Sequence, residues 1–405
     1  MMGKSGRLPR PVLKFKGGTS IYPFKGLSLG FKPLRGPSEI KLGLLWEKKV
    51  SGKAEELLDL MLNGYKSFKG MTEVFDVDVS VEKLEVNTLE EAHKELEKFE
   101  GFDVCMVAIP DEISLPEDMD YYIPFKQQAA SVGVPSQMVT YSTLQYGSKN
   151  VYVLFNLALN LYGKAGGVAW GLAEKLSSEV FIGVDVAGSY VVASLFVEPG
   201  NPRVGWFYEF NPEVEVAVSV REVVLRALRA AYRFLGRALS SVVVQRDGRA
   251  HWSEVEALRS AFSEAKSKGW FKEDGYYAYL EVKKRVGVRV IRKRGGRLLN
   301  PDKGVYLWLT KNTLLVTTTG APERPLPSQS GLVKPIALTL VDTSNWERSI
   351  LDLSKDTYWL SQLHWGSAFV TPRLPITTLY AHKVAHLLSL GAYPPPEYAG
   401  TLWFL

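Results

Sequence analysis

Apolar residues follow two alternating patterns in the first part of the chain. Short apolar runs such as IKLGLLW (40–46) and DVCMVAIP (103–110) are separated by stretches in which apolar residues recur every three or four positions. The runs are typical of buried strands and the other stretches of amphipathic helices. Strands that alternate with helices favour βαβ units and a largely parallel sheet. We therefore expect an α/β domain over residues 39–178.

Within this domain the pattern predicts both helices and strands. The expected helices lie near 52–68, over 90–100, over 121–132 with an end at Gly133, and over the apolar stretch 151–167. An alternating stretch, TEVFDVDVSVEKLEV (72–86), predicts a strand, and PSQMVTYSTL (135–144) a short strand and turn.

A second domain is expected to begin near residue 179, where a new set of apolar β-rich runs starts. EVFIGVDVAGSYVVASLFVEP (179–199) contains two β-rich apolar runs joined at a glycine, which is typical of a hairpin. Two helices and two strands follow, namely a long helix over 219–239, a strand that ends at RDG (246–248), a helix over 253–269 and the strand YYAYLEVKK (276–284). Strand-like runs at 304–310 and 313–320 and a helix at YAHKVAHLL (380–388) complete a second domain over residues 179–405.

Positive charge is clustered. The formal net charge of +6 is modest, but residues 1–38 carry eight Lys or Arg and no acid, and KKRVGVRVIRKRGGR (283–297) carries eight more. Such clusters are typical of proteins that bind phosphate-rich ligands, although a solvated basic strand pair is the simpler alternative. Because residues 1–38 are also rich in Gly and Pro, we expect an arm that covers a sheet edge, contacts nucleic acid or binds a partner.

The single cysteine and the lengths of the apolar runs indicate the cellular compartment. The single cysteine, Cys105, cannot form an intramolecular disulfide, which fits a reducing compartment. No apolar run reaches the roughly 18 to 20 residues of a membrane span, and the N-terminus has no signal-peptide pattern. We therefore expect a cytoplasmic protein without a membrane partner.

Two aspartates stand at the ends of apolar strands. Asp185 follows FIGV and Asp247 follows VVVQR, each with a glycine close by. Asp-Gly is a common turn dipeptide, so each aspartate alone indicates little. If the two strands are neighbours, however, the carboxylates converge and need a hard cation such as Mg²⁺. A metal pair at such a site activates water for phosphodiester cleavage.

From residue 181 onward, seven segments resemble the Piwi domain of Argonaute proteins, an RNase H-like fold. In chain order they are IGVDVAG, VVVQRDGRAHWSEVEAL, LEVKKRVGVRV, NPDKGVYLWLT, GLVKPIALTLVD, LSQLHWGSAF and RLPITTLYAHKVAHLL. The resemblance implies a catalytic tetrad of Asp185, Glu222, Asp247 and His364, in which the two aspartates and the histidine bind Mg²⁺ or Mn²⁺. Glu222 would be a mobile glutamate, for which Glu213 and Glu215 are close competitors. An acid near a helix N-terminus also has a simple electrostatic explanation.

A second group of residues suits a strand terminus. Tyr122 and Lys126 are spaced i,i+4 and share a helix face. Gln137 follows a turn, and Lys164 comes from the next helix. Lysine charge, an amide donor and an aromatic ring together suit a terminal phosphate and its base.

These residues resemble the Mid-domain motif by which Argonautes bind the 5′ phosphate of a guide strand. The resemblance adds Asn160, where many eukaryotic relatives have lysine, and so implies a metal in the pocket. It also implies that the terminal carboxylate of Leu405 helps to hold that metal. A hydrophobic C-terminus that docks on a core is the structural alternative.

The resemblance covers residues 40–405 and implies a compact arrangement. We expect a basic arm (1–38), a Rossmann-like Mid domain (39–178) and an RNase H-like Piwi domain (179–405), with no room for N and PAZ domains.

The function this implies is guide-dependent nucleic-acid binding with metal-dependent cleavage of the paired target, in defence against foreign nucleic acid. Guide and target could each be RNA or DNA, with a DNA target favoured. One alternative is a guided protein that does not cleave and recruits a separately encoded effector. Another is an unguided RNase H-like nuclease. The sequence leaves homodimer formation open.

Overall fold

The structure is a computed structural model that describes residues 5–90, 92–116, 119–198, 202–210, 212, 215–320 and 331–405. The chain forms two compact units. Unit 1 contains residues 1–12, 172–364 and 371–386, and unit 2 contains residues 13–171, 365–370 and 387–405. Each unit is therefore assembled from three separate segments of the chain.

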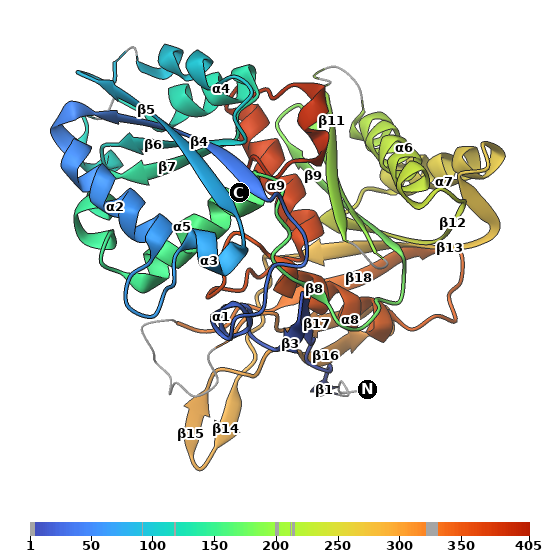
Figure 1. Cartoon of the computed structure of the whole chain (residues 1–405). Helices are drawn as coiled ribbons and strands as arrows, with labels where there is room; N and C mark the ends of the chain where they lie inside the picture. The colour runs from blue at the N-terminus through green and yellow to red at the C-terminus, as the bar shows by residue number, and fades with distance from the viewer. Residues whose placement is uncertain are drawn as a thin grey trace. The chain divides into compact units, whose positions relative to one another are not determined.

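Unit 2 is built on a four-stranded parallel sheet with the order β5-β4-β6-β7 (Figure 1). The strands are β4 (Glu39–Glu47), β5 (Asp78–Val86), β6 (Val104–Ile109) and β7 (Ser136–Thr140). The central strand β6 is buried along its whole length, and β4 is buried from Leu42 onward. Continuous apolar runs are expected where both faces of a parallel sheet are covered, which is the pattern seen in the sequence.

Helices cover both faces of this sheet. They are α2 (Ser51–Asn63), α3 (Met71–Phe75), the 3₁₀ helix η2 (Ala92–Phe99), α4 (Tyr122–Val132) and α5 (Val151–Lys164). On one face, Leu96 and Phe99 of η2 and Phe125 of α4 share a core with β4 and β6. Gly133, with φ 81°, ends α4 in the left-handed conformation that glycine tolerates, as predicted.

The prediction for residues 72–86 needs a correction. Only Asp78–Val86 is a strand, because the preceding residues form the short helix α3. Its buried residues Met71, Val74 and Phe75 are spaced three and four apart, so a helical turn buries them all on one face. The predicted helix over 90–100 is present as the 3₁₀ helix η2.

Unit 1 contains a nine-stranded sheet with the order β1-β16-β17-β18-β13-β12-β9-β10-β11. Its strands are β1 (Ser5–Arg7), β9 (Val180–Ala187), β10 (Tyr190–Val197), β11 (Arg203–Phe210), β12 (Leu239–Asp247), β13 (Phe271–Lys283), β16 (Val305–Thr310), β17 (Thr313–Val316) and β18 (Ile336–Thr343). β9, β10 and β11 are antiparallel, whereas β12 runs parallel to both of its neighbours, β9 and β13.

The two faces of this sheet are covered by different helices. Val180, Ile182 and Val184 share a core with α6 (Val216–Leu235) and α7 (Trp252–Ser267). The alternate positions face α8 (Ile350–Leu360) and α9 (Ile376–Ser389), because Gln245 of β12 donates a hydrogen bond to Thr357 of α8 and accepts one from Thr377 of α9. Strand alternation therefore places Asp185 and Asp247 on the α8 and α9 face.

Gly183 of β9 allows α9 to approach the sheet closely. A Cβ atom at this position would lie 2.2 Å from the carbonyl carbon of Thr377 and 2.4 Å from its oxygen. Because the atoms in the way belong to the backbone, they cannot move aside as a flexible side chain can.

We expect Gly183→Ala to destabilise the protein by about 1–3 kcal/mol, since the added methyl group must push the start of α9 away from β9. Urea denaturation measures the change. Gly52→Ala is the matched control, because a Cβ there meets nothing within 4 Å and alanine favours the helix. Wild-type stability of Gly183→Ala would show that α9 does not need this close contact.

The N-terminal segment is partly built into the sheets. Ser5–Arg7 pairs with β16 at the edge of the nine-stranded sheet, so these residues cover a sheet edge, one of the three roles left open by the sequence. In unit 2, β2 (Leu13–Phe15) pairs with β3 (Gly18–Ser20), and α1 (Pro23–Ser28) follows.

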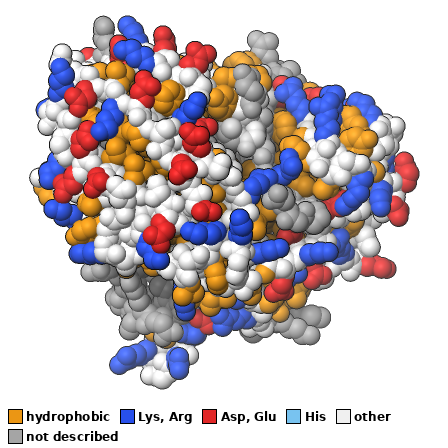
Figure 2. Space-filling model, viewed as in Figure 1, with side chains coloured by type: hydrophobic (Ala, Val, Ile, Leu, Met, Phe, Trp, Pro, Cys, Tyr) orange, Lys and Arg blue, Asp and Glu red, His pale blue; other side chains and the backbone are white. Residues whose placement is uncertain are grey.

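The last part of the basic run lies in a projecting hairpin of β14 (Arg292–Arg294) and β15 (Arg297–Leu299), and Figure 2 shows Lys and Arg side chains at the surface of this hairpin. The remaining short elements are β8 (Gly171–Leu172), η1 (Lys48–Val50), η3 (Glu112–Ser114), η4 (Thr143–Gly147), η5 (Ser361–Leu363) and η6 (Pro396–Gly400). None of the helices in the described part of the chain is long and apolar enough to span a bilayer.

Candidate metal centre and strand-end pocket

Asp185 lies near the end of β9 and Asp247 is the last residue of the neighbouring parallel strand β12. Gln245 pairs with Gly183 and Arg246 with Val184, so Asp247 and Asp185 occupy the next positions in register. Each aspartate is only 7% exposed. The sequence prediction that the two carboxylates meet at one end of neighbouring strands therefore agrees with the geometry.

A histidine from α9 completes the group. Nδ1 of His382 lies 2.7 Å from Oδ2 of Asp185 and 3.9 Å from Oδ2 of Asp247. One ligand atom from each of the three residues lies within 4.8 Å of the others. The His382 side chain is 48% exposed, so the group is accessible from solvent. Carboxylate oxygens and an imidazole nitrogen are suitable donors for Mg²⁺ or Mn²⁺.

Positive charges flank the two carboxylates. Burial raises the pKa of Asp247, and the neighbouring Asp185 charge raises it further, whereas the hydrogen bond from Lys284 opposes these effects. The Lys284 ammonium lies 2.8 Å from Oδ2 of Asp247. On the Asp185 side, Nη1 of Arg246 lies 3.8 Å from Oδ1, while Nε of Arg246 binds Glu254 at 2.9 Å.

His364, the histidine predicted to be the metal ligand, is not in this group. It is half-buried, its shielded Nδ1 has no hydrogen-bond partner in the described structure, and its ring lies against Tyr380 of α9 with centroids 6.0 Å apart. Burial, assisted by the charge of Lys383, lowers its pKa to about 3, which keeps it neutral. The structure thus places His382, not His364, beside the two aspartates.

The sequence did contain a signal for His382. Within the predicted helix YAHKVAHLL, Ala381, Val384 and Ala385 are buried and form the apolar face, whereas His382 lies outside that face. A histidine on the polar side of a helix that packs on a sheet is a ligand candidate. The prediction of His364 rested instead on the resemblance of QLHWGS, ahead of RLP, to the family pattern.

We call Asp185, Asp247 and His382 the metal group. The predicted glutamate, Glu222, also lies apart from it. Glu222 is on α6, which covers the other face of the sheet, and it pairs with Arg221. Glu215 is exposed and directly precedes α6. Glu213 lies outside the described residues. The assignment of a catalytic glutamate therefore stays a prediction.

Tyr122 and Lys126 share one face of α4, as their spacing predicts. The Lys126 ammonium lies 5.7 Å from the centroid of the Tyr122 ring and donates a hydrogen bond of 2.7 Å to the main-chain oxygen of Ser136. Tyr122 is 41% exposed, whereas Lys126 is buried. Gln137 follows Ser136 on β7 and donates to the main-chain oxygen of Met138 at 3.0 Å. A partly exposed ring and a buried lysine thus lie close together in the first half of α4.

Lys164 lies near the end of α5 and contacts the C-terminal segment. Its buried ammonium donates a hydrogen bond to the main-chain oxygen of Leu405. One turn earlier, the amide of Asn160 donates to the main-chain oxygens of Asn156 at 2.8 Å and Gly366 at 3.1 Å. The predicted proximity of Lys164 and Leu405 is present in the structure.

The charges of Lys126 and Lys164 both act on the buried thiol of Cys105. Burial raises the pKa of this thiol to about 12, and the charges of Lys126 and Lys164 both oppose that rise. Cys105 pairs with Ser136 across β6 and β7, so both ammonium groups lie near the same part of the sheet. The free cysteine is a core residue, as expected.

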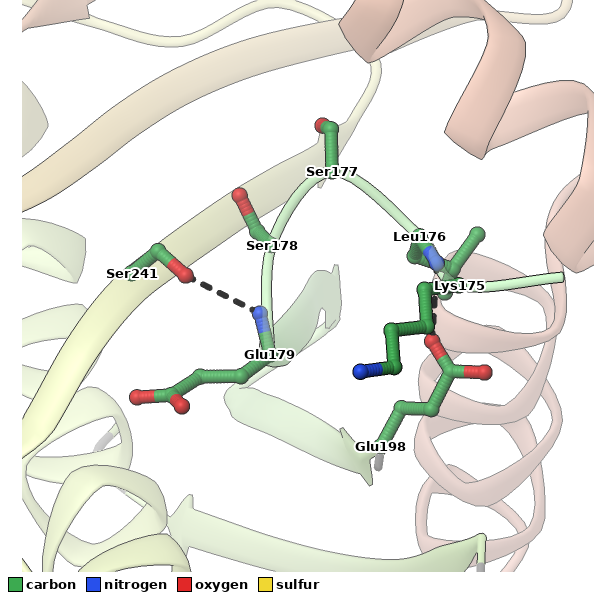
Figure 3. A pocket seen from close by; sticks show the side chains of 7 residues that line it. All are labelled: Lys175, Leu176, Ser177, Ser178, Glu179, Glu198 and Ser241. Atoms are coloured by element: carbon green, nitrogen blue, oxygen red, sulfur yellow. Dashed lines mark hydrogen bonds between the residues drawn. The ribbon is translucent and has the colours of Figure 1, made fainter. Parts of the chain in front are cut away.

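A separate pocket of about 190 Å³ lies at the opposite ends of β9 and β12 from the aspartates (Figure 3). It is lined by Lys175, Leu176, Ser177, Ser178, Glu179, Glu198 and Ser241. Glu179 precedes β9 and Ser241 lies early in β12, whereas Asp185 and Asp247 lie late in these strands. The pocket is therefore not part of the metal group.

Residues 104–391 match the Piwi domain family, so the chain belongs to this family. It is similar to Piwi-like protein 1 of Gallus gallus, with 24% identity over 280 residues that cover 65% of this chain and 31% of that protein. It is also similar to Protein argonaute-3 of Drosophila melanogaster, with 25% identity over 288 residues that cover 66% of this chain and 31% of that protein. The aligned region is thus about a third of the length of these relatives.

Nearly the whole chain is similar in fold to solved Argonaute and Piwi structures. Clostridium butyricum Argonaute, bound to a guide DNA and a 19-mer target DNA, superposes with a TM-score of 0.77 at 21% identity, covering 100% of this chain and 55% of that one. Drosophila Piwi superposes with a TM-score of 0.78 at 16% identity, covering 99% and 56%. The expected α/β class and RNase H-like Piwi fold are confirmed.

Proposed function

We propose that the protein binds a short guide strand and cleaves the target strand paired with it. The observation that carries this proposal is the group of two buried carboxylates and one solvent-accessible imidazole at the strand ends of a Piwi-family sheet. The fold similarity to an Argonaute bound to guide and target DNA supports it.

Asp185, Asp247 and His382 would hold Mg²⁺ or Mn²⁺, with oxygen atoms from the aspartates and a ring nitrogen from the histidine. A divalent cation there activates water and stabilises the leaving oxygen in phosphodiester hydrolysis. Because a carboxylate can only accept, Nδ1 of His382 donates its proton to Asp185 in the structure described. If Nδ1 is the ligand atom, metal binding replaces this hydrogen bond.

The 5′ end of the guide would bind at Tyr122, Lys126, Gln137 and Lys164. A terminal phosphate provides the lysines with charge-assisted hydrogen bonds in place of main-chain contacts, and the exposed Tyr122 ring provides a surface for the first base. Asn160 and the oxygen of Leu405 would help to hold a metal ion beside that phosphate.

The basic hairpin of β14 and β15 would contact the phosphate backbone without reading its sequence, since recognition of the target is left to base pairing. A cytoplasmic role in defence against foreign nucleic acid, with a DNA target, is part of the same proposal.

A second candidate function is guided binding without cleavage, coupled to recruitment of a separate effector. The position of Glu222 favours it, because α6 holds this residue on the other face of the sheet from the metal group. Such a protein needs the basic surface and the proposed phosphate-binding residues, namely Tyr122, Lys126, Gln137 and Lys164, but not the metal.

A cleavage assay distinguishes these functions. The purified protein is incubated with a 5′-phosphorylated guide, a matched labelled target and Mn²⁺, with each strand tested as RNA and as DNA. We expect cleavage at one position that requires both the guide and Mn²⁺ and stops on addition of a chelator. Tight guided binding with an intact target would favour the recruiter, and cleavage that ignores the guide would favour an unguided nuclease.

A further inference from the structure

Lys284 occupies a cation position in the metal group. It directly follows β13, which runs parallel to β12 and pairs Val282 with Asp247. Its ammonium lies 2.8 Å from Oδ2 of Asp247. The same oxygen lies 3.9 Å from Nδ1 of His382, so Lys284 binds the carboxylate atom that faces the third member of the group.

A second nearby cation, Arg246, is held quite differently. Arg246 is buried, and its guanidinium is fixed by Glu254 and by the main-chain oxygen of Asp247. The Lys284 side chain is 29% exposed and carries its charge on a flexible stem. Arg246 is therefore a permanent part of the site, whereas Lys284 is able to change partners.

We propose that Lys284 is an internal counter-ion that competes with the divalent metal for Asp247 and moves to a backbone phosphate when a nucleic acid binds. This inference rests on the proposed metal-dependent function. A divalent cation on Oδ2 of Asp247 would lie next to the ammonium, and like charges at such distances repel strongly in a buried site. A phosphate supplies an alternative partner for the ammonium, so strand binding favours metal binding, and metal binding favours strand binding to the same extent.

The first test measures Mn²⁺ binding by calorimetry without nucleic acid. Lys284→Gln removes the competing charge, and we expect it to bind Mn²⁺ about tenfold more tightly than the wild type. Lys284→Arg keeps the charge and is expected to bind as the wild type does. Lys283→Gln is the matched control, because the neighbouring Lys283 pairs with Glu281 rather than with Asp247. A defect in folding would weaken Mn²⁺ binding. Tighter Mn²⁺ binding by Lys284→Gln would therefore show that the Lys284 charge competes with the metal for Asp247.

The second test adds a guide and a matched target whose scissile linkage is a 3′-methylene phosphonate, which keeps the negative charge but has no P–O3′ bond to cleave. In the wild type the strands should tighten Mn²⁺ binding by a larger factor than in Lys284→Gln. Equal factors would overturn the transfer of Lys284 to a phosphate.

Two results separate this inference from the proposed function. Unchanged or weaker Mn²⁺ binding by Lys284→Gln, with wild-type binding that Asp185→Asn abolishes, would overturn the role of Lys284 and leave the metal site intact. Absence of Mn²⁺ binding in every variant would overturn both the metal site and the inference.

Discussion

His382→Ala is expected to reduce metal-dependent cleavage by about a thousandfold or more, whereas His364→Phe should cleave at nearly the wild-type rate. A metal contributes several kcal/mol of transition-state stabilisation, and each 1.4 kcal/mol corresponds to about a factor of ten in rate. His382 supplies one of the three donor atoms of the group. His364 is half-buried elsewhere with a shielded Nδ1 that has no hydrogen-bond partner in the described structure, so an apolar ring removes a polar atom that has no partner.

Single-turnover cleavage measures this difference, and calorimetry with Mn²⁺ checks it without reference to activity. Asp247→Ala provides the reference for a site that cannot bind the metal. Thermal unfolding of each variant establishes that it is folded. A folded His364→Phe protein that binds no Mn²⁺, beside a His382→Ala protein that does, would restore His364 as the ligand.

Joint replacement of Lys126 and Lys164 by alanine is expected to reduce the preference for a 5′-phosphorylated guide over a 5′-hydroxyl guide by about a hundredfold. Each charge-assisted hydrogen bond contributes roughly 1.5–3 kcal/mol, and part of this is already present in the contacts to main-chain oxygens. The lost difference is therefore smaller than the full value of two such bonds.

The ratio of the two guide affinities, measured by competition, is the useful quantity, since damage to the fold would weaken both guides alike. Lys98→Ala is the control, because this exposed lysine pairs only with the nearby Glu95 among the described ion pairs of unit 2. If the double variant lost affinity equally for both guides, the lysines would be assigned to the stability of unit 2.

The two aspartates were accessible to sequence reasoning because local patterns place them. Each stands at the end of an apolar strand, and parallel strands bring such ends to the same edge of a sheet. The Tyr122 and Lys126 pair was accessible for a similar reason, because i,i+4 spacing within one helix fixes a shared face.

The positions of His364 and His382 depend on contacts between segments that are far apart in the sequence. His364 precedes Trp365 and Gly366 in a segment without strong periodicity, and its ring packs against Tyr380 of α9. His382 reaches Asp185 only because α9 packs closely on Gly183 of β9, almost two hundred residues earlier in the chain. Neither fact can be obtained from spacing along the sequence.

The segment of residues 71–77 was ambiguous for another reason. Alternating apolar residues in a stretch this short fit one helical turn as well as a strand. The left-handed Asp76, with φ 55°, separates α3 from β5, and a non-glycine residue in that conformation is uncommon. Sequence pattern alone does not reveal such a position.

Because each unit is assembled from three separate segments, the protein cannot complete its folding until late in translation. In unit 2, Lys164 can contact Leu405 only after the ribosome has added residues 172–386, most of which belong to unit 1. Contacts of such long sequence separation slow folding, and they leave the early part of the chain incomplete during translation. Expression of residues 1–171 alone would therefore yield a fragment with exposed apolar surface that lacks the contact between Lys164 and Leu405.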